Sequence, residues 1–316
     1  MIGNASLRGR SRNLRDLAHR AVNQRYLFLM LLPALVWLIV FVYMPIGGWL
    51  MAFQNYSPAK GLWGSPWVGL KHFKNFITDY QFWPILRNTV FISLLNILGG
   101  TVAAVVLALL LNEVRSTKFK RTVQTITYLP HFISYIVVGN IFMTILSPSG
   151  GVVNHLLMSL GWIDAPIFFF AQPKGFWFLL SGINIWKEAG WDAIIYLAAI
   201  TAINSELYEA AEIDGAGRLR RMWHVTMPGI RSTIVVLLIM ASGYVLNAGF
   251  EPSYVLGNPI VSDYAEVIDT YVYNMGLRNT MFSYATAVGM FRMAVSLVIL
   301  LATNFFAKKV GERGIL

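Results

Sequence analysis

The polar interval EAAEIDG at 209–215, followed by VTMP at 225–228, lies between two long apolar stretches and has a clear internal order. A short acidic segment leads to Gly215, and a basic stretch then runs to Pro228, where the next apolar stretch begins. Glycine adopts backbone dihedrals that other residues resist, so the chain can turn sharply at Gly215. Ser205 is expected to cap the acidic helix, because its hydroxyl can accept from an unpaired backbone N–H. The interval therefore predicts a short helix and a turn that join two membrane spans.

The composition indicates that lipid surrounds much of this chain. Its 316 residues are 56% hydrophobic and only 13% charged, whereas soluble domains carry roughly 25% charged residues. The chain has no cysteine, which excludes a disulfide scaffold. The net charge of +10, taken alone, is compatible with nucleic-acid binding. The positions of the charged residues decide between that function and membrane topology.

Six apolar stretches are long enough to cross a membrane, for which a helix needs about 20 residues. The sequence predicts an all-α, polytopic membrane protein with six transmembrane helices, at about 27–52, 87–113, 121–146, 176–203, 231–251 and 282–307. Pro130 falls inside the third span. The domain organisation that follows is a basic N-terminal arm at 1–25, one transmembrane domain at 26–307 with a polar loop at 204–230, and a tail at 308–316.

The distribution of Lys and Arg predicts the orientation. The segments on the side of the N-terminus contain 17 Lys and Arg residues, against six in the segments on the other side. The positive-inside rule then places both termini in the cytoplasm. The excess charge is explained by topology, so no nucleic-acid partner is required. Residues 1–25 are either a basic helix on an anionic membrane face or a disordered arm.

The loop at 204–230 resembles the coupling loop of permease subunits in binding-protein-dependent ABC importers. That family pattern reads Glu-Ala-Ala, three residues, Gly, nine residues, then Ile-x-Leu-Pro, and here Val225 and Met227 replace Ile and Leu. The resemblance implies the type I ABC importer permease fold in the cytoplasmic (inner) membrane of a bacterium. The implied partners are a second homologous permease subunit, two ATP-binding subunits and an extracytoplasmic solute-binding protein. The alternative is an ordinary helical hairpin between two spans.

The same resemblance implies that five residues of the loop contact the ATPase. The ATPase-coupling residues would be Glu209, Ala210, Ala211, Asp214 and Gly215. The chain has no Gly-x-x-x-x-Gly-Lys-[Ser/Thr] phosphate loop. We therefore expect no catalytic residues and no cofactor in this chain, with ATP and magnesium bound by the partner subunits. His131 and His155 stand alone in the sequence and are interpreted as structural or interfacial rather than as metal ligands.

Polar residues inside two spans are candidates for the substrate pathway, because charge within a membrane is costly and usually faces a pathway or a partner. These residues are Asn184, Trp186, Lys187, Glu188, Trp191 and Asp192 in the fourth span and Arg292 in the sixth. One interpretation is a translocation site, in which polar groups bind sugar hydroxyls and Trp faces stack on sugar rings. The other is an internal network that pairs Arg292 with Glu188 or Asp192.

The overall layout is similar to that of sugar permeases of the oligosaccharide and polysaccharide type, including those of maltose and alginate transporters. Lys187 and Arg292 would suit an acidic sugar, although Glu188 and Asp192 balance their charge. Two other functions stay open at this point. An ion-coupled secondary carrier should show repeated halves with broken helices, and an intramembrane enzyme would need catalytic groups at a suitable spacing.

Overall fold

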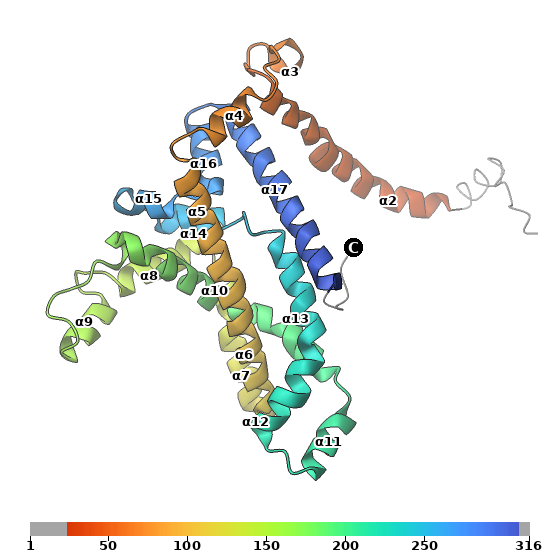
Figure 1. Ribbon diagram of the computed structural model, residues 1–316, viewed down its shortest axis with the longest axis vertical. Helices are drawn as coiled ribbons and strands as arrows, with labels where there is room; N and C mark the ends of the chain where they lie inside the picture. Colours follow the sequence, from red (N-terminus) through yellow and green to blue (C-terminus); the bar gives the residue numbers. More distant parts are fainter. Residues whose placement is uncertain (1–23, 310–316) are drawn as a thin grey trace, which may run out of the picture.

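The protein was studied as a computed structural model that describes residues 24–309 (Figure 1). The described chain is helical, apart from one isolated β-bridge between Gln54 and Trp67. The prediction of an all-α protein is therefore confirmed for this part of the chain. The proposed membrane-surface helix in the N-terminal arm and most of the C-terminal tail lie outside the described residues.

Four long helices are apolar enough to cross a membrane, judged by their length and composition. They span Arg25–Phe53, Phe82–Glu113, Arg218–Ser242 and Phe282–Lys309. The first consists of α2 (Arg25–Leu38), η1 (Ile39–Tyr43) and η2 (Met44–Phe53), and the second of α5 (Phe82–Leu94), η3 (Leu95–Gly99) and α6 (Gly100–Glu113). The third consists of α12 (Arg218–Arg221), η6 (Met222–Thr226) and α13 (Met227–Ser242), and the fourth is α17 (Phe282–Lys309). They correspond to the first, second, fifth and sixth predicted spans.

The boundaries predicted for the fifth span, 231–251, are wrong. The helix begins at Arg218 and ends at Ser242, because the π-helical turn η6 continues directly into α13 and Pro228 lies in the first turn of that helix. Pro228 has no backbone N–H to donate within this continuous helix, and it follows directly on the π-helical turn. A Gly-containing connection at 243–249 follows, with Gly249 at a φ of +91°.

The third predicted span, 121–146, is not one straight helix. It consists of α7 (Thr117–Tyr128), η4 (Leu129–Phe132) and α8 (Tyr135–Ile145), with a bend of 105° between the two arms. Pro130 lacks a backbone N–H, and Ser134 starts the second arm by accepting from the Val137 N–H at 3.4 Å. Counting the bent pair as one span gives five candidate spans in the described residues.

The fourth predicted span corresponds to α10 (Pro173–Thr201), a single helix of 29 residues. It is long enough to cross a membrane, but Lys187, Glu188 and Asp192 make its middle too polar to qualify by composition. It packs along α6, where Ala104 and Ala108 meet Ala193 and Tyr196 in a buried cluster. Among the polar residues of α10, Lys187 is buried, Asn184 and Glu188 are half-buried, and Asp192 is exposed.

Shorter helices connect these long ones. They are α3 (Gly61–Gly64), α4 (Lys71–Ile77), α9 (Val152–Ser159), η5 (Phe169–Ala171), α11 (Ser205–Ile213), α14 (Phe250–Leu256), η7 (Pro259–Val261), α15 (Ser262–Ala265), α16 (Ile268–Tyr273) and η8 (Asn274–Arg278). The group from α14 to η8 lies between α13 and α17 in the sequence and packs against α17, α10 and α5. Two further buried clusters hold this group to the long helices.

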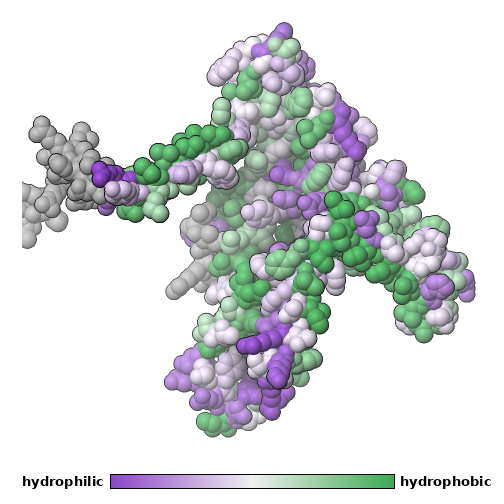
Figure 2. Space-filling view, turned by 180° about the vertical axis from the view of Figure 1, so that it is seen from behind, coloured by the Kyte–Doolittle hydropathy of each residue, from purple (hydrophilic) through white to green (hydrophobic). Residues whose placement is uncertain are grey.

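The first long helix leans away from the rest of the molecule (Figure 1). No residue of α2 is buried, and its most apolar window is 0% buried inside the protein. Apolar side chains cover its exposed length (Figure 2). Only its C-terminal part, η2, packs closely against α17 and α4.

Candidate coupling loop and substrate pathway

The loop at 204–230 forms one tip of the molecule, where hydrophilic side chains gather (Figures 1 and 2). Helix α11 runs from Ser205 to Ile213, and the chain then turns at Gly215, whose φ is +73°. Such a positive φ explains why the turn requires glycine. The predicted helix and turn are therefore present as expected from the sequence.

The helix is capped by a different residue from the one predicted. The Asn204 side chain accepts from the Glu206 backbone N–H at 3.0 Å, and Ser205 is instead the first residue of the helix. Both residue types are good caps, so the neighbouring positions were hard to distinguish by sequence. The cap fixes the start of α11 one residue earlier than expected.

Two contacts hold α11 to the following helix and leave the five motif residues on its surface. Glu212 pairs with Arg221 at 2.9 Å, and the Tyr208 hydroxyl lies 3.0 Å from that of Thr226 in η6. Glu209, Ala210, Asp214 and Gly215 are exposed, and Ala211 is half-buried. Glu209 has no ion-pair partner within residues 24–309. The tip therefore presents a free carboxylate beside two small side chains.

The charged residues at the middle of α10 are bound to one another and to the bend of α7–η4–α8. Lys187, which is 5% exposed, donates from Nζ to the His131 backbone oxygen and to Glu188 Oε1, both at 2.8 Å. Glu188 Oε2 lies 2.5 Å from His131 Nδ1. The His131 carbonyl belongs to the last turn before the break, and a cation is favourable at a helix C-terminus. Lys187 and Glu188 thus stabilise the bent helix.

The close approach of the two helices at this bend depends on Gly190. A Cβ atom at that position would overlap the backbone carbonyl of Thr127 in α7. The absence of a side chain lets α7 lie directly against α10 and brings His131 to Glu188. Gly190 does not have a positive φ. Glycine is therefore needed here for the space that it leaves to α7, and not for its backbone conformation.

Aromatic side chains complete the contacts around this cluster. The Tyr135 hydroxyl donates to Asn184 Oδ1, and Lys187 Nζ lies 4.8 Å from the centre of the Tyr135 ring. Trp191 stacks on His131 with ring centroids 4.4 Å apart. Trp186 packs edge-on against Phe142 at 5.3 Å. Trp186 and Trp191 make these ring contacts while remaining 48% and 42% exposed.

Asp192 and Arg292 lie apart from this network. Asp192 lines a cavity of about 280 Å³ with Asn96 and Tyr196. Arg292 forms an ion pair with Asp269 of α16, so its expected pairing with Glu188 or Asp192 is wrong. The physical reason is that the short helices between α13 and α17 bring their own carboxylate to α17. The predicted pathway residues therefore fall into separate groups.

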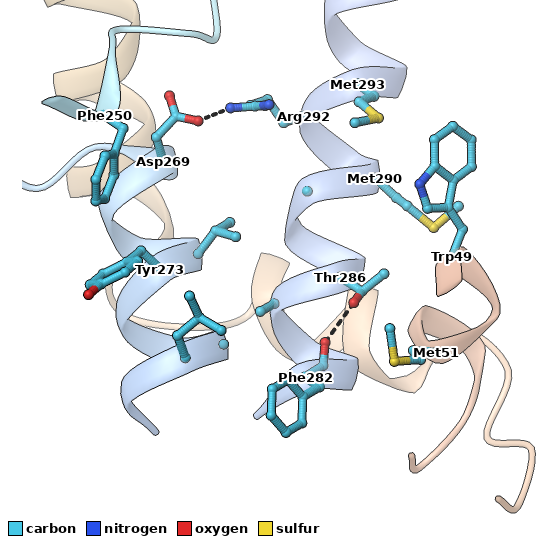
Figure 3. A pocket seen from close by; sticks show the side chains of 15 residues that line it. Trp49, Met51, Phe250, Asp269, Tyr273, Phe282, Thr286, Met290, Arg292 and Met293 are labelled. Atoms are coloured by element: carbon cyan, nitrogen blue, oxygen red, sulfur yellow. Dashed lines mark hydrogen bonds and ion pairs between the residues drawn. The ribbon is translucent and has the colours of Figure 1, made fainter. Parts of the chain in front are cut away.

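The Arg292–Asp269 pair borders a cavity of about 560 Å³ between α16, α17 and η2 (Figure 3). Aromatic and methionine side chains make up most of the labelled wall, namely Trp49, Met51, Phe250, Tyr273, Phe282, Met290 and Met293. Asp269 Oδ2 is buried and has no hydrogen-bond partner within the described chain. This cavity combines an arginine, an unsatisfied acceptor and aromatic faces.

Several residues of these sites were missed from the sequence, chiefly Tyr135, Asp269 and Tyr273. Asp269 is the one charged residue in the apolar stretch 267–275, and this isolation was the available signal. Tyr135 carries no comparable signal, because aromatic residues are frequent throughout the chain. Its place opposite Asn184 depends on the bend at 129–134.

Comparison with known proteins establishes the class. Residues 100–312 match the family described as "Binding-protein-dependent transport system inner membrane component". The chain belongs to this family, and it is a multi-pass inner-membrane permease component of an ABC transporter whose ATPase is a separate subunit. The family predicted from the loop at 209–228 is confirmed.

Individual relatives match over nearly their whole length. The chain is 47% identical to the polygalacturonan/rhamnogalacturonan transport system permease protein YteP of Bacillus subtilis (strain 168), covering 94% of this chain and 92% of the relative. It is 44% identical to Protein LplB of the same organism, over 92% of this chain and 91% of the relative. A solved bacterial alginate ABC transporter, in complex with an alginate pentasaccharide-bound periplasmic protein, contains a chain with 40% identity and a TM-score of 0.85, covering 94% of this chain and 99% of that one.

Proposed function

We propose that this chain is one of two permease subunits that import an acidic oligosaccharide or polysaccharide. The observation that carries the proposal is its similarity, over nearly the full length, to a polygalacturonan/rhamnogalacturonan permease and to a chain of a transporter for "the acidic polysaccharide alginate". A solute-binding protein delivers the substrate, and two ATP-binding subunits bind ATP and magnesium. The proposed topology has six spans, with α10 and the bent α7–η4–α8 as two of them, and both termini in the cytoplasm.

The loop at 204–230 is proposed to couple this permease to the ATPase. Glu209 is free to pair with a basic group, and Ala210 and Ala211 let a partner surface approach closely. Asp214 and Gly215 form the turn beside them. The Tyr208–Thr226 contact joins α11 to η6, which is continuous with α13. A displacement of α11 on ATP binding would therefore move α13. The ATPase contact and the substrate pathway would then be coupled, because their contacts differ between two conformational states.

The substrate is proposed to pass between α10 and the helices that surround it. Trp186 and Trp191 have exposed faces that can stack on sugar rings, and Asn184 and Asp192 add polar groups beside them. Lys187 and Glu188 are proposed to hold this wall in place rather than to bind substrate, because their polar atoms are already bonded. Arg292 is proposed to line a second part of the pathway.

Purification of the native chain in detergent with its co-expressed ATPase subunit tests the coupling loop. Glu209→Lys and Gly215→Arg should reduce the recovered ATPase at least ten-fold, because the first reverses the free charge and the second adds a side chain at a positive φ. Arg220→Glu is the matched control, since it reverses an exposed charge in the same loop outside the motif positions. Equal recovery of the ATPase with all variants would reject the loop as the coupling site.

Uptake into proteoliposomes tests the substrate class. The assembled transporter and its solute-binding protein should take up trigalacturonate in an ATP-dependent manner and should not take up maltotriose, a neutral sugar of the same length. Uptake of maltotriose in preference to trigalacturonate would contradict the acidic substrate while leaving the importer in place.

A further inference from the structure

A third cavity, which the sequence did not indicate, lies beside the short helices α14 to η8. Its volume is about 540 Å³. Its polar lining comes from Ser253 and Tyr254 of α14, from Asn258 and Glu266, and from Asn274 and Arg278 of η8. It contains none of the residues predicted for the pathway. Its chemistry therefore has to be explained separately.

Arg278 is the cation of this cavity, and it differs from Arg292 in having no acidic partner. Within residues 24–309, no carboxylate lies at ion-pair distance from Arg278. Its guanidinium lies 5.8 Å from the Tyr254 ring centroid and 5.7 Å from that of Tyr273, and it donates to the Tyr254 hydroxyl at 3.3 Å. Most of its five N–H donors remain available. A planar guanidinium of this kind binds a carboxylate in a bidentate manner.

Glu266, the one acid among the described residues that line this cavity, has its own partner. Glu266 Oε1 accepts from Asn274 Nδ2 at 3.1 Å, and this contact orients the amide of Asn274. The amide oxygen, Oδ1, is left buried and without a hydrogen-bond partner in the described structure. An acceptor that lines a cavity in this state is suited to a hydroxyl donor from a ligand.

A second polar atom in the wall is also unsatisfied. Ser253 is 3% exposed, and its Oγ has no hydrogen-bond partner in the described chain. Buried polar atoms are ordinarily bonded, and leaving one unpaired costs about 1–3 kcal/mol. Ser253 and Asn274 line the same cavity as Arg278, and a ligand hydroxyl that reached either buried oxygen would supply its missing hydrogen bond.

Aromatic rings connect this cavity to the one that contains Arg292. Phe250 stacks on Tyr254 with centroids 4.9 Å apart, and Tyr254 meets Tyr273 edge-on at 5.3 Å. Tyr254 lines the polar cavity, whereas Phe250 and Tyr273 line the larger one (Figure 3). The two cavities therefore share one aromatic partition, with an arginine on each side.

We infer that the polar cavity is a subsite for one carboxylate-bearing sugar unit, with Arg278 binding the carboxylate and Ser253 and Asn274 binding ring hydroxyls. Tyr254 offers a face to the ring. This assignment rests on the proposed import of an acidic polysaccharide and names the groups that would select for its acidity. A following unit of the same chain would meet the Arg292 cavity across the aromatic partition.

Equilibrium binding to the assembled transporter in nanodiscs, without the solute-binding protein, tests this subsite. The probe is radiolabelled trigalacturonate, displaced by unlabelled trigalacturonate or by its methyl ester, which has the same rings but no charge. The native assembly should bind the acid at least ten-fold more tightly than the ester. Arg278→Gln should weaken binding of the acid by about ten-fold or more, and should abolish the preference over the ester, because a charge-assisted bond is lost.

Matched variants separate recognition from folding. Arg278→Lys should retain much of the preference, since it keeps the charge, and Lys74→Gln should change nothing, because Lys74 is an exposed cation that lines neither cavity. Ser253→Ala should weaken binding two- to five-fold for acid and ester alike, because it removes a hydroxyl that no other residue in the described chain uses.

The outcomes distinguish this inference from the proposed function. If the native transporter imports trigalacturonate but Arg278→Gln keeps the full preference for the acid, the subsite assignment is overturned and the importer stands. An equal loss of acid and ester binding in Arg278→Gln also overturns it, since Arg278 would then act only on the structure. If the native transporter neither imports nor binds trigalacturonate, the acidic substrate itself is rejected, and this assignment is rejected with it.

Discussion

The charged cluster of α10 and the arginine-lined cavities beside α16 both place polar groups among apolar helices, but they use these groups differently. In the cluster, Lys187, Glu188 and His131 satisfy one another and a broken helix end. In the cavities, Arg278 has no acidic partner within 24–309, and Ser253 Oγ is unsatisfied. A charge inside a span is thus a weak indication of a binding site until its partners are known.

The largest effect is expected where the cluster loses its cation. Lys187→Met would remove the donor to the His131 carbonyl and leave Glu188 with His131 as its remaining partner, and removal of one member of a buried pair costs about 3–5 kcal/mol. Thermal unfolding of the detergent-solubilised protein would measure this loss. The matched control is Lys174→Met at the exposed start of α10. A Lys187→Met variant as stable as the native protein would contradict the structural role given to the cluster.

A smaller loss of stability is expected in the larger cavity. Asp269→Leu removes the partner of the half-buried Arg292, and lost hydrogen bonds to charged groups cost about 1.5–3 kcal/mol. The double variant Asp269→Leu/Arg292→Met should recover most of the unfolding free energy without recovering trigalacturonate uptake. If the double variant transports normally, the ion pair is structural only, and this cavity resembles the α10 cluster more than the Arg278 subsite.

Tyr135→Phe should have an intermediate effect of about 1–2 kcal/mol, because it leaves Asn184 Oδ1 without its donor while keeping the ring beside Lys187. Tyr244→Phe serves as the control, since Tyr244 is 65% exposed and lies outside the bent segment. Chemical denaturation in mixed micelles would compare the two. Equal losses would show that the Asn184 contact contributes nothing specific.

The smallest loss of stability is expected for Ser253→Ala, which should unfold at the same temperature as the native protein or at a higher one, because the buried hydroxyl has no partner to lose. Ligand binding should nevertheless weaken. A marked loss of stability would mean that Ser253 is satisfied in the protein, and it would remove one of the differences between the two regions.

The sequence predicted the family, the coupling loop and the long helices because these depend on local patterns. Hydrophobic stretches define spans, and the motif at 209–228 is specific in its spacing. The bend at Pro130 was not predicted, because proline within a membrane helix is often accommodated without a break of 105°. Asn204, not Ser205, caps α11. The sequence did not decide between these neighbours, because both side chains are good N-caps.

The pathway residues were predicted only in part, because their partners come from distant segments. Arg292 was found by its charge, but Asp269 lies in a short helix that no span pattern reveals. Lys187 was found in the same way, and besides its neighbour Glu188 its partner is a backbone carbonyl, which any residue could have supplied. Arg278 lies in a connecting helix and was therefore counted only toward topology.

The exposed first helix has a consequence for the order of assembly. Because α2 buries none of its residues within the described chain, it can enter the bilayer as soon as it leaves the ribosome, and its insertion does not wait for other spans. Its C-terminal part, however, is fastened by α17, including a 2.9 Å bond from the Tyr56 N–H to Ser283 Oγ across 227 residues of sequence. We therefore expect the span Arg25–Phe53 to pack against α17 only after Phe282–Lys309 has been synthesised. Until then, the span Arg25–Phe53 is inserted in the membrane without the contacts that η2 makes to α17.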